Sequence, residues 1–65
     1  NIPRVSYADR QRGDLIYYDN GYGKIIHIAI YLGNDQVIEA WPPQVTVWPV
    51  VNWAHPHVYG VQRLF

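Results

Sequence analysis

The stretch from Ile25 to Trp41 reads IIHIAIYLGNDQVIEAW and decides the fold. Its first eight residues are mostly β-branched or aromatic, which favours a strand, and residues 33–35 (GND) are of the types that tight turns require. A second strand over 36–41 follows, so the stretch predicts a β-hairpin. Because side chains alternate along a strand, the two faces of the first strand carry different side chains. One face has Ile26, Ile28, Ile30 and Leu32, and the other has His27, Ala29 and Tyr31.

Further strands are predicted on both sides of this hairpin. Leu15–Tyr18 precedes it, and Val45–Trp48 and Tyr59–Leu64 follow it, each bounded by turn residues or proline. The first dozen residues have no sustained period and are interpreted as a linker, and Val50–Trp53 forms one helical turn at most. About five short strands with almost no helix predict an antiparallel meander or a small barrel-like sheet. Since a sheet must bury an apolar face, we expect one face to be open to a further segment.

The bulk composition excludes several classes of function. With 65 residues the chain is a single unit over 1–65, and five basic and five acidic side chains cancel, which disfavours nucleic acid as a partner. Its apolar runs fall far short of the roughly 20 residues that span a membrane. A chain this short buries only about 60% of its unfolded surface and usually needs disulfides or a metal, yet it has no cysteine. These facts predict a missing companion segment.

His27 and Glu39 are the first candidates for chemistry. If residues 33–35 form a three-residue loop, Ala29 lies opposite Glu39 and His27 lies opposite Trp41, so His27 and Glu39 are diagonal neighbours about 7 to 8 Å apart at the backbone. A carboxylate bound to one ring nitrogen fixes the tautomer of a catalytic histidine. A loop of two or four residues would instead place the pair on opposite faces. A strand histidine with a structural role is the alternative.

Other polar and aromatic residues offer weaker candidates. The spacing of His55 and His57, with His27 as a third ligand, can bind zinc. A histidine pair in a proline-rich loop is more often exposed on the surface without a function, and no metal is assigned. Tyr31 and Trp41 share the face of His27 and are predicted to border a binding site. The alternative for both aromatic residues is packing within the sheet.

A structural role is the more common interpretation for the remaining tryptophans and for one aspartate. Trp48 and Trp53, with Trp41, could form a stacking platform for sugar or peptide, but tryptophan in a small β domain more often fills the core. Asp14 follows a glycine at a strand start, where it is predicted to cap a turn.

Four motifs resemble one family in order and spacing. RGDLIYY at 12–18 resembles the GDL plus paired aromatics of NlpC-type domains, and HIAIYLGN at 27–34 resembles their histidine strand. VIEA at 37–40 places Glu39 where the family has a polar residue, most often histidine, and where its actinobacterial peptidoglycan endopeptidases have glutamate. Gln62 and Arg63 resemble the closing strand. The resemblance covers about residues 7–64, with Ala29 in place of the usual glycine.

The resemblance implies a papain-like α+β fold of which this chain is the antiparallel sheet half. It implies a secreted or wall-associated thiol peptidase without a cofactor, which cleaves peptidoglycan stem peptides after γ-D-glutamate and before a diamino acid. Carried over to this chain, His27 is the general base and Glu39 the residue that orients it.

The family's cysteine nucleophile opens a helix in the preceding half, and this chain has no cysteine. Without a thiolate no covalent intermediate forms. We therefore expect a companion N-terminal segment or chain that carries the cysteine, since the sequence starts where the helical half would end. Two alternatives stay open, namely an SH3-like module that binds peptide or glycan and a pseudoenzyme of the same family.

Overall fold

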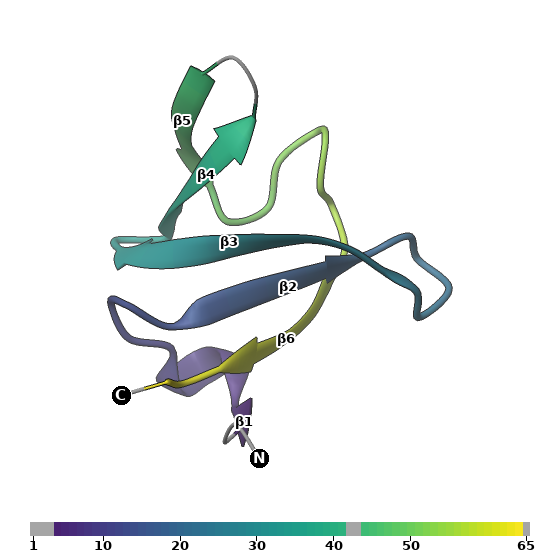
Figure 1. Ribbon diagram of the computed structural model, residues 1–65. Coiled ribbons are helices and arrows are strands. Elements are labelled where there is room, and N and C mark those ends of the chain that lie inside the picture. Colours follow the sequence, from purple (N-terminus) through teal and green to yellow (C-terminus); the bar gives the residue numbers. More distant parts are fainter. Residues whose placement is uncertain (1–3, 42–43, 65) are drawn as a thin grey trace.

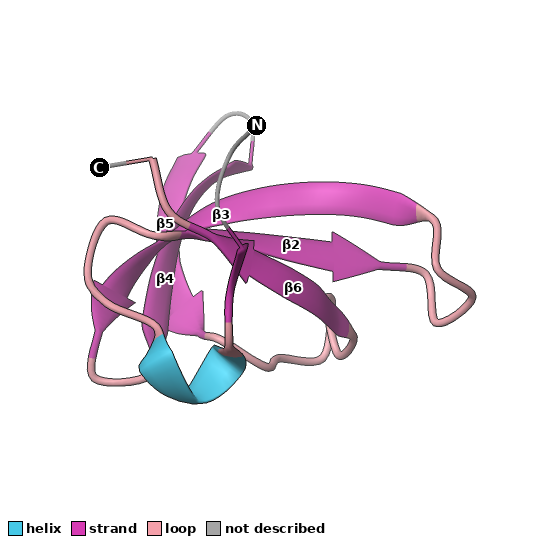
Figure 2. Ribbon diagram, turned by 90° about the horizontal axis from the view of Figure 1, so that it is seen from below, coloured by secondary structure: helices cyan, strands magenta, loops and turns pink. Residues whose placement is uncertain are grey.

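The computed structural model describes residues 4–41 and 44–64, with Trp41 described in its backbone alone. They form one sheet of six antiparallel strands in the order β1-β6-β2-β3-β4-β5 (Figure 1). Within the described residues, one short 3-10 helix, η1 at Tyr7–Asp9, is the only helical element (Figure 2). The strands are β1 Arg4–Val5, β2 Leu15–Asp19, β3 Ile25–Gly33, β4 Gln36–Trp41, β5 Gln44–Pro49 and β6 Val58–Gln62.

The antiparallel sheet and the near absence of helix are confirmed, and the strand count of about five is corrected to six. The first dozen residues are not a linker, because β1 pairs with β6 through Arg4 opposite Gln62 and Val5 opposite Val61. Such a short edge strand leaves almost no periodic signal in a sequence, and only the unpaired edge of β6 gives it a partner. Residues 50–53 contain bends rather than a helical turn.

The β3–β4 hairpin reaches the predicted register by a different route. Gly33 pairs with Gln36, so the loop has two residues and not three, and both Asn34 and Asp35 have positive φ angles of 52° and 60°. Positive φ at both central positions is the type I′ turn that suits the twist of a hairpin. The pairing shifts between Tyr31 and Gly33, which is a β-bulge. The bulge inserts one extra residue into β3, so the two strands pair with the same parity as they would with a three-residue loop.

The two faces of the sheet differ as the alternation predicts. The inner face, on the concave side of the curled sheet, carries the buried core, and segment 50–57 crosses it on the way from β5 to β6 (Figure 1). The buried apolar residues are Ile16, Tyr18, Ala29, Tyr31, Val37, Val50 and Val61. On the opposite face, Ile26, Ile28 and Ile30 are 53%, 48% and 46% exposed. We call this exposed surface of β3, continued by Val47 of β5, the outer face; the expected apolar open face is therefore present.

Asp14 and Arg63 connect the start of β2 to the end of β6. The guanidinium donates from Nε to Oδ1 and from Nη2 to Oδ2 of the buried carboxylate, both at 3.0 Å. The carboxylate also accepts from the backbone N–H of Gln11 at 2.8 Å, which confirms the predicted turn cap. These hydrogen bonds, that from Arg63 first, lower the pKa of Asp14. Two residues of the matched motifs thus hold the sheet together.

We predict that Arg63→Ala lowers the free energy of unfolding, because it removes two hydrogen bonds from the buried Asp14 carboxylate. The depressed pKa of Asp14 means that its stabilisation is present above the ordinary value of 3.8 and is lost as pH falls through the folded value. The difference in stability between wild type and variant should therefore be largest near pH 7 and should shrink as pH falls. Urea titrations between pH 3 and 7 measure both effects, with exposed Arg12→Ala as control. Equal stability of the two variants would contradict the structural role of the pair.

Candidate active site

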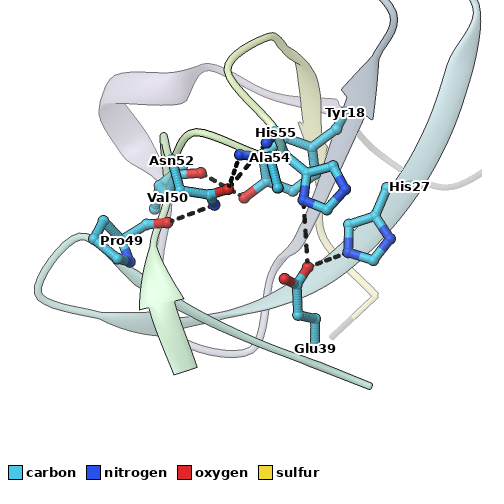
Figure 3. Close-up of polar contacts among 8 residues, drawn as sticks. All are labelled: Tyr18, His27, Glu39, Pro49, Val50, Asn52, Ala54 and His55. Carbon is cyan, nitrogen blue, oxygen red and sulfur yellow. Dashed lines mark hydrogen bonds and ion pairs between the residues drawn. The ribbon is translucent and has the colours of Figure 1, made fainter. Parts of the chain in front are cut away.

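His27 of β3 and Glu39 of β4 meet on the inner face. Nε2 of His27 contacts Oε2 of Glu39 directly (Figure 3), and their side chains are 15% and 3% exposed. The structure thus brings together the two residues that strand parity predicts to be neighbours. A buried carboxylate is costly unless hydrogen-bonded, and this contact supplies a donor from the neighbouring strand.

His55 is the third member of this cluster, and it comes from segment 50–57. Its Nδ1 lies 3.8 Å from Oε2 of Glu39, so the carboxylate faces two imidazoles (Figure 3). The rings of His55 and His27 are stacked, with centroids 4.2 Å apart and planes inclined by only 6°. The sequence singled out His55 only as a possible metal ligand beside His57, because nothing local reveals that it folds onto β3.

Segment 50–57 is held in a shape that delivers His55 into the inner face. The Asn52 Oδ1 accepts from the backbone N–H groups of Ala54 and His55 at 3.0 and 2.9 Å, which forms a tight asparagine turn. One residue pair anchors the start of the segment, since the Tyr18 hydroxyl donates to the carbonyl of Val50 at 2.7 Å. An asparagine three residues before the histidine is the one sequence signal that could have suggested this turn.

Tyr18 lies beside both imidazoles on the inner face. Its ring centroid is 5.7 Å from that of His27 and 5.2 Å from that of His55. Burial first, and the charge of Glu39 second, raise the pKa of Tyr18, so its hydroxyl stays protonated and acts as a donor. Tyr18 therefore packs against the cluster and tethers the segment that carries His55.

The electrostatics of the cluster favour a neutral His55. Burial first, and the charge of His27 second, lower the pKa of His55, and Glu39 opposes them. Both main causes disfavour a second positive charge next to His27. These causes favour the neutral form of His55 in the cluster.

Three potential metal ligands lie within 4.8 Å of one another here, namely one atom each of His27, Glu39 and His55. The lone pair of an imidazole nitrogen lies in the plane of its ring, and the two rings are nearly parallel. An ion bound tetrahedrally to both nitrogens must lie in both planes, so one ring would have to rotate. The geometry as it stands favours a hydrogen-bonded and stacked cluster. His57, which was considered as a ligand together with His55, is exposed, and its ring lies against Gly21.

Tyr31 and Trp41 are the residues predicted to border the binding site, and the structure describes the side chain of Tyr31 alone. Tyr31 is buried on the inner face, and its hydroxyl accepts from the backbone N–H of Asp35 at 3.0 Å. These contacts favour packing and support of the hairpin turn over direct contact with a substrate. The Trp41 side chain lies outside the described residues, and its backbone pairs with Gln44.

The other two tryptophans are Trp48 of β5 and Trp53 of segment 50–57. Trp53 is 83% exposed, and its ring meets that of the half-buried Trp48 edge to face at 6.4 Å. Trp48 fits the core-filling interpretation in part, since it packs against the core cluster. Trp53 does not, because most of its surface is open to solvent.

We predict that His55 makes stability depend on pH. Because its folded pKa is below the ordinary 6.5, the unfolded chain binds more protons in that window, and stability falls as pH drops below 6.5. The slope reaches at most about 1.4 kcal/mol per pH unit. The titratable residues Tyr18, His27 and Glu39 face His55. The contribution of His55 to the pH dependence of stability is therefore measured as the difference between wild type and His55→Gln. Denaturant unfolding at pH 5 to 8 should show a shallower slope in His55→Gln and an unchanged slope in His57→Gln; parallel curves for all three proteins would refute the prediction.

The sequence was compared with known proteins. The model of the NlpC/P60 family matches residues 2–62. The peptidoglycan endopeptidase RipB of Mycobacterium tuberculosis (strain ATCC 25618 / H37Rv) is 49% identical over an alignment of 48 residues that covers 71% of this chain and 19% of RipB. The probable endopeptidase p60 of Listeria seeligeri is 49% identical over 37 residues, 57% of this chain and 7% of that protein. That of Listeria grayi is 36% identical over 47 residues, 72% and 9% respectively.

This chain spans less than a fifth of the length of these relatives. The family match nevertheless includes the histidine strand, the Glu39 strand and the closing strand with Gln62. The resemblance inferred from the four motifs is thus confirmed: the chain belongs to the NlpC/P60 family.

Proposed function

We propose that this chain is the histidine-bearing part of a peptidoglycan endopeptidase that hydrolyses wall peptides. The observation that carries the proposal is the contact between His27 and Glu39 at the positions of the family motifs. Relatives named peptidoglycan endopeptidase and probable endopeptidase support the activity. The proposed bond lies between γ-D-glutamate and a diamino acid, and the proposed location is secreted or at the cell wall.

The proposed chemistry is attack by a cysteine thiolate with His27 as the base. Glu39 engages Nε2, so Nδ1 is the nitrogen that faces the thiol and takes its proton. The thiolate attacks the peptide carbonyl, and His27 returns the proton to the leaving amine. Water then hydrolyses the thioester and restores the thiol. The Glu39 carboxylate stabilises the imidazolium that forms and keeps its ring oriented.

The cysteine has to come from outside these 65 residues, which contain none. We propose that a helical segment covers the outer face and completes a papain-like α+β fold. A solvent-exposed row of isoleucines along one strand is unusual in a stable domain, and the relatives are more than five times longer than the matched region. The described pairing of β3 with β4 runs from Ile30 to Gly33, so β3 has an edge beside His27 that is not paired with β4. The covering segment would pass this edge to bring its cysteine to Nδ1 of His27 on the inner face.

The open outer face favours the peptidase over a stand-alone SH3-like module, which would close its apolar surface. A pseudoenzyme that binds wall peptides has the same fold and is distinguished by activity alone. Residues 4–41 and 44–64 include no helix with the length and hydropathy needed to cross a membrane.

We predict that His27→Ala in the full-length protein lowers kcat on a wall-derived peptide by about 10²- to 10⁴-fold, because the general base is lost. Glu39→Gln should cost less, since an amide oxygen still accepts from Nε2 but carries no charge for the imidazolium. Exposed His57→Ala is the matched control. Mass spectrometry of the cleaved peptide measures turnover and identifies the bond. Wild-type turnover by His27→Ala would end the catalytic assignment, and binding without cleavage by the wild type would establish the pseudoenzyme.

We predict that Ile28→Thr destabilises the full-length protein by about 1 to 3 kcal/mol, because a covered outer face would bury the hydroxyl and lose a methylene contact. Threonine keeps the β-branched shape that a strand prefers. Val51→Thr makes a similar change at an exposed apolar residue off the sheet and should stay within about 0.5 kcal/mol. Chemical denaturation measures both. If Ile28→Thr is as mild as Val51→Thr, the outer face is solvated and no segment covers it.

A further inference from the structure

We propose that His55 is a positioning residue, which holds the ring plane of His27 by stacking and confines the Glu39 carboxylate that orients it. This proposal rests on the proposed function, because it assigns His55 a part in the same reaction. Nothing in the four matched motifs includes His55, which lies between the last two of them. The assignment arises from where segment 50–57 places the imidazole.

The first argument concerns the orientation of the His27 ring. A histidine side chain rotates about two bonds, and one hydrogen bond through Nε2 fixes the direction of that nitrogen without fixing the ring plane. The parallel ring of His55, 4.2 Å away, blocks rotation on one side. Tyr18 packs near both rings, with centroids 5.2 to 5.7 Å away. The plane of His27, and with it the direction of the Nδ1 lone pair, is set by these two neighbours.

The second argument concerns Glu39. Its carboxylate is nearly fully buried, and the His55 ring occupies space from which water would otherwise reach Oε2, with Nδ1 at 3.8 Å. Exclusion of water strengthens the attraction between carboxylate and imidazolium. A neutral imidazole excludes water without competing for the carboxylate as a second cation. Burial lowers the pKa of His55 and keeps it in that neutral form.

The third argument is that segment 50–57 is built to present this residue. Three buried or partly buried contacts shape it: the Tyr18 hydroxyl on the Val50 carbonyl, and the Asn52 Oδ1 on two backbone N–H groups. An imidazole that is almost fully buried is expensive to keep unless it serves packing or chemistry. An aliphatic side chain would fill the same space at lower cost, so the stack and the carboxylate contact are what a histidine adds.

Steady-state kinetics with the full-length protein test the proposal through two variants of His55. His55→Phe keeps a flat ring for stacking and loses the nitrogens, whereas His55→Gln keeps a polar group of similar volume and loses the ring. We expect His55→Gln to lower kcat by about tenfold to a hundredfold with KM within about twofold, and to shift the acidic limb of the pH profile. His55→Phe should recover part of the loss, and His57→Gln should match wild type. Wild-type kcat and an unchanged pH profile in His55→Gln would overturn the proposal.

A measurement without turnover separates this proposal from the proposed function. Two-bond ¹H–¹⁵N NMR of ¹⁵N-histidine protein, at alkaline pH where imidazoles are neutral, reports which nitrogen of His27 carries the proton. We expect one tautomer with the proton on Nε2 in wild type, His55→Phe and His57→Gln, and a mixture in His55→Gln. The same single tautomer in His55→Gln refutes the positioning role even if the enzyme is active. An inactive wild type that still shows the expected tautomers refutes the proposed function and leaves the positioning of His27 established.

Discussion

The burial of one carboxylate governs the inner face of this protein. Glu39 is buried, and a buried charge is tolerated only if hydrogen-bond donors or cations contact it. The bulge in β3 turns His27 to the same face, and the asparagine turn in segment 50–57 brings His55 against the His27 ring and near the same carboxylate oxygen. Each of these features lies in a different part of the chain. They converge because the curled sheet leaves one interior, and that interior is where the carboxylate points.

The outer face departs from the usual pattern for a sheet with one covered face. The inner face holds the apolar core together with a carboxylate and two imidazoles, whereas the outer face displays isoleucines instead of polar residues. In an antiparallel sheet that faces solvent, the outward positions are normally polar. An apolar row of this kind on an open face is what the proposed covering segment would bury.

Motif residues that look functional in the sequence divide into two physical roles. Asp14 and Arg63 are 49 residues apart and form a bidentate ion pair that fastens the two ends of the matched region. Tyr18 anchors the segment that carries His55. His27 and Glu39 form the contact on which the proposed catalytic role rests. A family motif therefore records structural constraints as well as chemistry, and contacts in three dimensions are needed to tell them apart.

The sequence by itself determined the alternation along β3 and the position of the hairpin turn, because these depend on neighbours close in the chain, and it made the shared face of His27 and Glu39 depend on the loop length. It could not determine that a two-residue loop would be compensated by a bulge near Leu32, since both solutions have the same residue types and differ in backbone angles. Only the tertiary structure decided that β1 would find the edge of β6, that the isoleucine face would be the open one, and that His55 would stack on His27. These outcomes depend on contacts between residues distant in sequence, and such contacts leave no periodic trace in the chain.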